Sequence, residues 1–147
     1  MSEIVVQKFG GTSVGTVDRI DSVAEIIKNA SKSNKIVVVV SAMGGETNRL
    51  VDLAKAFGDD PDKREFDALV STGETVSSAL LTMALHSKGI KAKSFSASQI
   101  SMRTTSSYSK AKILDVDAKK ILDVIDSDTI PIITGFQGVT ELSLIHI

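Results

Sequence analysis

The strongest constraint on the fold is an unbroken β-branched run, Ile-Val-Val-Val-Val, at residues 36–40. A run without polar alternation is typical of a parallel strand that is covered on both faces. Residues 17–32 before it carry apolar side chains at helical spacing, and a shorter apolar run lies at residues 4–6. Strand, helix and strand in this order predict a right-handed βαβ unit. The expected fold class is therefore α/β with a mainly parallel sheet.

The same alternation continues along the chain. Helical spacing is found at residues 49–57, 64–70, 75–88 and 115–125, and extended segments are expected at residues 91–95, 110–114 and 129–134. Residues 101–112 are rich in hydroxyls and predict an extended excursion or a hairpin. In the last helix we expect Val116, Ile121, Leu122 and Ile125 to face inward.

Lys-Phe-Gly-Gly-Thr-Ser follows the first strand, at residues 8–13. The glycines leave bare backbone that a ligand can approach closely, and Thr12 and Ser13 are good N-cap residues. A strand, a glycine turn and a helix start together favour an anion site. The Walker A loop is excluded because Thr16 stands where that loop needs its lysine. An ordinary βα turn with a surface lysine remains the alternative.

Two further glycine turns follow predicted strands, with Ser-Ala-Met-Gly-Gly-Glu-Thr-Asn at residues 41–48 and Gly-Phe-Gln-Gly at residues 135–138. Ligands of open α/β sheets bind outside the carboxyl ends of the strands. These loops should therefore meet at one edge. Helix capping is the alternative role for Ser41 and Thr47. Ser71 and Glu74 have the spacing of a capping box, which is the alternative to a ligand-binding role for Glu74.

Composition excludes several classes of protein and site. The net charge of −1 gives no global field for nucleic acid or a membrane surface. The sequence has no cysteine and two histidines, His86 and His146, so we expect no disulfide, thiolate site or zinc site. We expect no membrane-spanning apolar run and no signal peptide, and hence a cytoplasmic protein.

Taken together, the motifs at residues 8–13, 38–43, 46–48, 71–74 and 135–138 resemble, in order and spacing, those of the aspartokinases within the amino-acid kinase family. The resemblance implies a three-layer αβα sandwich like that of carbamate kinase. It implies transfer of the γ-phosphoryl group of MgATP to the side-chain carboxylate of L-aspartate, the first step toward lysine, threonine and methionine. It also implies ATP and Mg²⁺ as cofactors, L-aspartate as the small-molecule partner, and a homo-oligomer when full length.

By the same resemblance, Lys8 and Glu74 are the catalytic candidates. Lys8 would neutralise charge on the transferring phosphoryl group, and Glu74 would pair with the α-ammonium of aspartate. The candidates for nucleotide and phosphate binding are Lys8, Phe9, Gly10, Gly11, Ser13 and Ser41. Those for the substrate are Ser41, Thr47, Glu74 and Phe136. No residue is assigned to a metal.

The chain departs from the family pattern in two places. Thr104-Thr105 stands where the family often has Thr-Asp, so that loop receives no role. The adenine-binding half is absent, so we expect residues 1–141 to be the N-terminal part of a catalytic domain, inactive alone. Residues 142–147 are expected to be a non-native scar without a partner element. The alternatives are another acceptor (glutamate, acetylglutamate, carbamate or a nucleotide), or a non-catalytic phosphate-binding module.

Overall fold

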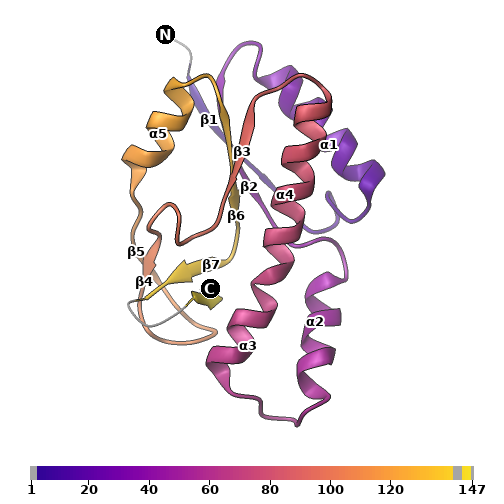
Figure 1. The fold of residues 1–147 in the computed structure, drawn as a ribbon, viewed down its shortest axis with the longest axis vertical. Helices are drawn as coiled ribbons and strands as arrows, with labels where there is room; N and C mark the ends of the chain where they lie inside the picture. Colours follow the sequence, from indigo (N-terminus) through magenta and orange to yellow (C-terminus); the bar gives the residue numbers. More distant parts are fainter. Residues whose placement is uncertain (1–2, 141–143, 147) are drawn as a thin grey trace.

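The computed structural model describes residues 3–140 and 144–146. Its main sheet has four parallel strands in the order β1-β2-β6-β3 (Figure 1). The strands are β1 (Ile4–Phe9), β2 (Lys35–Val40), β6 (Ile130–Thr134) and β3 (Ala92–Phe95). The β-branched run thus forms an inner strand, as its sequence predicted, because only such a strand can bury both of its faces.

Helices cover the two faces of this sheet. On one face, α1 (Val17–Ala30) and α4 (Thr72–Ser87) bury Ile27, Leu81 and Leu85 against the β2 and β6 side chains. On the other face, α5 (Ala118–Asp126) buries Ile125 beside Val37 and Ile133. The three-layer αβα sandwich that the sequence predicted is therefore confirmed.

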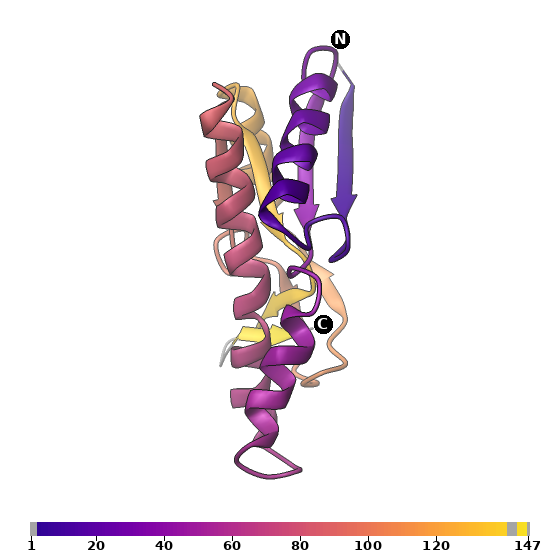
Figure 2. The same ribbon diagram turned by 90° about the vertical axis from the view of Figure 1, so that its right-hand side faces the viewer.

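Two further helices, α2 (Glu46–Lys55) and α3 (Lys63–Val70), project beyond the carboxyl end of the sheet (Figures 1 and 2). α3 runs into α4, and together they form a helical stretch of 25 residues, Lys63–Ser87. By length and composition this stretch could cross a membrane, contrary to our expectation. Half of its most apolar window is buried inside the protein, and core helices meet the same criteria of length and composition.

A second, smaller sheet has the strand order β5-β4-β7-β8. Its members are β5 (Ile113–Asp115), β4 (Arg103–Thr104), β7 (Gln137–Val139) and β8 (Leu144–His146). β4 and β5 pair antiparallel, which confirms the predicted hairpin. We expected no partner for the last residues, but β8 pairs with β7 and Ile145 is fully buried.

Several predicted boundaries were wrong by about one turn. α2 and α4 each begin three residues earlier than predicted, at Glu46 and Thr72, and α5 begins three residues later, at Ala118. Leu122 was predicted to face inward but is 43% exposed. Helical spacing locates a face only to within a broad stripe, and here Ile121 and Ile125 make the contact with the sheet.

Candidate functional site

The strands of the main sheet end together. In the ladder, Phe9 lies opposite Val40, and Val40 lies opposite Thr134. The three glycine turns that follow these residues are therefore neighbours at the carboxyl edge. This confirms that the glycine loops share one edge, where ligands of open α/β sheets bind.

The loops pack too closely for side chains at their glycines. A Cβ on Gly11 would lie 3.0 Å from the Ala42 carbonyl oxygen, and one on Gly44 would lie 3.3 Å from the Gly11 carbonyl oxygen. The Gly135 N–H donates to the Val40 carbonyl at 2.9 Å. Glycine is needed here for close approach of backbones, and the result is a surface of bare peptide groups.

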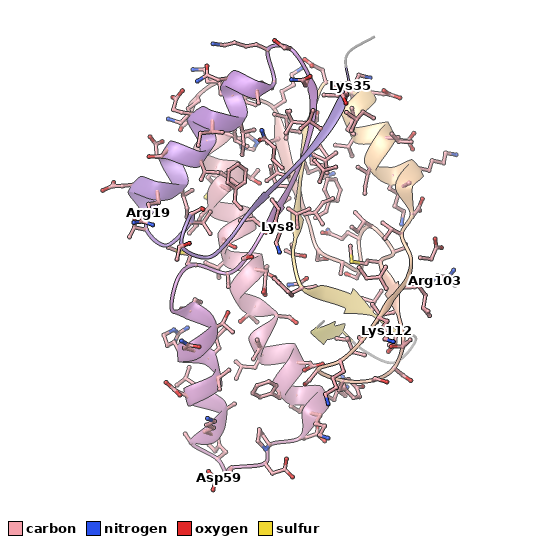
Figure 3. The ribbon with its side chains drawn as sticks, turned by 180° about the vertical axis from the view of Figure 1, so that it is seen from behind. Lys8, Arg19, Lys35, Asp59, Arg103 and Lys112 are labelled. Carbon is pink, nitrogen blue, oxygen red and sulfur yellow. The ribbon has the colours of Figure 1, made fainter. Side chains whose placement is uncertain are left out.

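Lys8 and Phe136 come together at this edge from opposite ends of the chain. The Lys8 Nζ lies 4.7 Å from the centroid of the Phe136 ring, a cation–π contact. Lys8 stands at the carboxyl end of the sheet, next to the second sheet (Figure 3). Phe136 has a φ of 52°, which is uncommon for a residue with a side chain. Its strained turn aims the half-exposed ring at the lysine.

The Ser13 backbone N–H donates to the Gly10 carbonyl at 3.0 Å and closes the first glycine turn. We predicted that Thr12 or Ser13 caps the following helix, but neither residue does so. Thr16 does so instead, accepting a hydrogen bond from the Arg19 N–H at 3.3 Å. The helix itself begins at Val17, where its apolar spacing predicted it, and Ser13 is exposed at the edge.

Both backbone polar groups of Ser41, its N–H and its carbonyl, are hydrogen-bonded. Its N–H donates to the Phe9 carbonyl at 3.0 Å, and its carbonyl accepts from the Ser77 Oγ of α4 at 2.6 Å. The sequence did not single out Ser77, because the two residues lie 36 positions apart. The capping role considered for Ser41 is wrong, since the N-cap of α2 is Gly45.

Thr47 lies in the first turn of α2, half-buried, and not in the preceding loop. Next to it, Glu46 forms a two-pronged ion pair with Arg49, with N–O distances of 2.7 and 2.8 Å. The hydrogen bond from Arg49 lowers the pKa of Glu46 below its usual value. The pair fixes the first helical turn that presents Thr47, and it keeps the Glu46 charge occupied with Arg49.

Glu74 is 2% exposed and lies in the first turn of α4. This turn packs on the loop of Ser41, since a Cβ on Gly73 would lie 2.9 Å from the Ala42 Cβ. The capping box is wrong, because within the described chain the Ser71 side chain makes no cap hydrogen bond. α3 continues almost directly into α4, so this junction does not need a side-chain cap. With the capping box excluded, the ligand-binding role considered for Glu74 remains, and the structure places its buried side chain beside the Ser41 loop.

Gln137 is a further residue of this region that the sequence reading missed. Its side chain is 1% exposed, and its amide nitrogen donates to the Ser71 carbonyl at 2.6 Å. Its amide oxygen accepts from the Thr134 hydroxyl at 2.7 Å. The glutamine therefore ties the turn after β6 to the start of α4. Position 137 carried a signal only in that it lies between two glycines of a strand-end turn.

The Ser77 hydrogen bond provides a first test of this geometry. Ser77→Ala should lower the free energy of unfolding by about 1–2 kcal/mol, because it leaves the Ser41 carbonyl without its helix partner. Urea unfolding of the chain measures this change. The control is Ser87→Ala on the same helix, where an exposed hydroxyl donates to the Ala84 carbonyl. Equal losses for both variants would contradict a special role for Ser77.

Comparison with known proteins places these motifs in a family. Residues 3–145 match the amino acid kinase family. The chain is 52% identical to an aspartate kinase of Stutzerimonas stutzeri and 51% identical to an aspartokinase of Geobacillus stearothermophilus, each over 139 residues. These alignments cover 94% of this chain and 34% of each relative. The chain therefore spans about a third of the length of the curated relatives that it matches.

Solved structures agree with this fold. The aspartate kinase from Synechocystis has a TM-score of 0.76 at 39% identity, over 99% of this chain and 23% of that protein. Escherichia coli aspartokinase III, solved with aspartate and ADP, has a TM-score of 0.86 at 24% identity, over 98% and 43%. An isopentenyl phosphate kinase has a TM-score of 0.72 at 18% identity, over 99% and 64%. The last two likenesses concern the fold alone.

Proposed function

The chain belongs to the amino acid kinase family, and on that premise we propose that it forms the phosphate- and acceptor-binding part of an aspartate kinase. The observation that carries the proposal is the gathering of Lys8, Phe136 and the Ser41 loop at one sheet edge, with the Glu74 turn packed on that loop. Sequence identity of about 50% to aspartate kinases supports the choice of acceptor.

The charges of the edge suit an amino acid that carries two carboxylates. Glu74 is a buried carboxylate, and burial strengthens its attraction for an ammonium group. Lys8 is an exposed cation at the end of β1. In our proposal, Glu74 holds the α-ammonium of aspartate, Thr47 contacts the same molecule, and Phe136 shapes its pocket. Lys8 then lies between the acceptor carboxylate and the phosphates, which otherwise repel each other.

The glycine turns would receive the phosphates of ATP. Phosphoryl transfer asks a protein mainly for positioning and charge stabilisation. The bare peptides of Gly10, Gly11 and Gly44 allow phosphate oxygens to approach the backbone, with Ser13 and Ser41 beside them. Lys8 is placed to stabilise the charge that develops on the transferring group.

The described residues do not offer a protein cage for Mg²⁺. In the described residues, no group of three or more His, Cys, Asp and Glu side chains has a metal-binding arrangement. We therefore propose that the nucleotide phosphates carry the ion.

We extend the proposal to the pathway, the cellular location and the oligomeric state of the longer protein. An aspartate kinase would feed the biosynthesis of lysine and threonine in the cytoplasm. The activity would require the remaining two-thirds of the length that the relatives have, and a homo-oligomer is expected for that longer protein.

The main competing function is that of a kinase in the same family that phosphorylates a different acceptor. The likeness to an isopentenyl phosphate kinase shows that this fold is not tied to amino-acid acceptors. The buried Glu74 favours an acceptor with a free ammonium, which carbamate, acetylglutamate and nucleotides lack. A non-catalytic phosphate-binding module is the other alternative, and it would bind ATP without turnover.

The test is an acceptor panel on a full-length version, in which the chain is extended by the remaining two-thirds. ADP release should be fastest with L-aspartate and slow with glutamate, acetylglutamate, carbamate and UMP. Faster ADP release with any other acceptor would overturn the choice of aspartate. ATP binding by calorimetry without ADP release on any acceptor would favour the non-catalytic module.

A further inference from the structure

We propose that Gln137 is a positioning residue that sets the spacing between the two ends of the acceptor site, and thereby its selectivity for aspartate over the longer glutamate. The inference deepens the proposed function and rests on it. It starts from the place of Gln137 in the chain, directly after Phe136, whose ring lies under Lys8. In space, the Gln137 side chain reaches the helical turn that carries Glu74.

Both ends of the Gln137 amide are engaged in the interior. The nitrogen donates to the Ser71 carbonyl at 2.6 Å and lies 3.4 Å from the Thr75 hydroxyl, and the oxygen accepts from Thr134 at 2.7 Å. These contacts fix the orientation of the amide, because its donors and acceptors cannot be exchanged. A buried and satisfied polar network of this kind rigidifies the elements that it joins.

The network joins the cation end of the site to its anion end. Ser71 is the residue directly before α4, and Glu74 lies three residues farther, in the first turn of that helix. Gln137 therefore links this turn to Phe136, while Ser77 links the same helix to Ser41 at 2.6 Å. The start of α4, with Glu74, is therefore held by the segments that follow two neighbouring strands, β2 and β6.

This spacing matters because aspartate and glutamate differ by one methylene group. In the proposed site, the ammonium stays at Glu74 and the side-chain carboxylate points toward Lys8. A pocket distinguishes one methylene by roughly 10- to 200-fold only when its dimensions are fixed. A link that holds Phe136 and the start of α4 at constant separation supplies that fixed dimension.

The experiment replaces Gln137 by methionine, which keeps the length and approximate volume but removes the three hydrogen bonds of the amide. In the full-length version, Gln137→Met should raise KM for aspartate about tenfold and lower the preference for aspartate over glutamate severalfold. KM for ATP should change less than twofold. Thr134→Val removes only the bond to the amide oxygen and should give a smaller change in the same direction.

The matched control is Thr82→Val. Thr82 is also buried on α4, at 8% exposure, and its hydroxyl donates to the Ser78 carbonyl at 2.8 Å, two turns beyond Glu74. This variant should lower the melting temperature without changing the aspartate-to-glutamate preference. A Gln137→Met variant that behaves like Thr82→Val, with unchanged preference, would overturn the inference and reduce Gln137 to a structural residue.

A double-mutant cycle with Glu74→Gln identifies the route of the effect. If Gln137 acts by positioning Glu74, the double variant and the single variant Glu74→Gln should have the same kcat/KM for aspartate, within about twofold. A loss of kcat/KM in the double variant equal to the product of the two single losses would overturn the inference. Wild-type protein that phosphorylates no amino acid would overturn the proposed function and this inference together. Wild-type activity toward aspartate with an unaltered preference in Gln137→Met would overturn the inference alone.

Discussion

Replacing Lys8 by alanine in the full-length version is expected to lower kcat for aspartate phosphorylation by on the order of a hundredfold or more. The physical reason is that the charge which Lys8 meets develops on the transferring group, so the lost interaction is stronger in the transition state than in the ground state. KM for aspartate should change far less. Steady-state kinetics with both substrates measure this difference.

The chain offers a close control for Lys8. Lys93 is also an exposed strand lysine that stacks on a ring, with its Nζ 5.5 Å from the centroid of Phe95, but it lies on β3. Lys93→Ala should leave kcat unchanged, so a general effect of losing a cation–π contact can be separated from catalysis. If Lys8→Ala raises KM and leaves kcat intact, Lys8 serves ground-state binding and the transition-state role is wrong.

Replacing Glu74 by glutamine should reduce kcat/KM for aspartate by about ten- to a hundredfold, or roughly 1.5–3 kcal/mol. The change keeps the shape of a side chain that is 2% exposed and removes only its charge. The loss should appear with aspartate and hardly with ATP, because the proposed partner of the carboxylate is the α-ammonium. Aspartate and ATP kinetics, together with a melting curve, test the prediction.

The second buried carboxylate of the same helical stretch provides the contrast. Asp67 is fully buried and accepts hydrogen bonds from the Ser109 N–H and hydroxyl, both at 3.0 Å. Asp67→Asn should lower the melting temperature and leave KM for aspartate unchanged, because it loosens a loop rather than a substrate contact. A Glu74→Gln variant with a lower melting temperature and normal aspartate kinetics would place Glu74 in the same structural class and refute its substrate role.

The sequence alone predicted the layered architecture and the edge at which the site lies. The β-branched run at residues 36–40 can be satisfied only by an inner strand, and three glycine turns directly follow apolar strands in the sequence. Both signals are local, since they depend on neighbouring residues. The sequence also placed Lys8 and Gly11 at one edge with Ser41, because the carboxyl ends of parallel strands coincide.

Local signals failed where the outcome depends on structure outside the motif itself. The capping box at Ser71 has the correct spacing, but α3 continues into α4 and the box is never formed. The last residues looked unpartnered because their partner, β7, is recognised only once the second sheet is assembled.

What only the tertiary structure decided is how the ends of the site are held relative to one another. Gln137 and Ser71 lie 66 positions apart in the chain, and Ser77 and Ser41 lie 36 apart. No periodicity links such positions, since each pair is brought together by crossover connections of the sheet. The residue types available for binding are therefore encoded locally, whereas their separation is set by buried hydrogen bonds between strands and α4 that exist only in the folded chain.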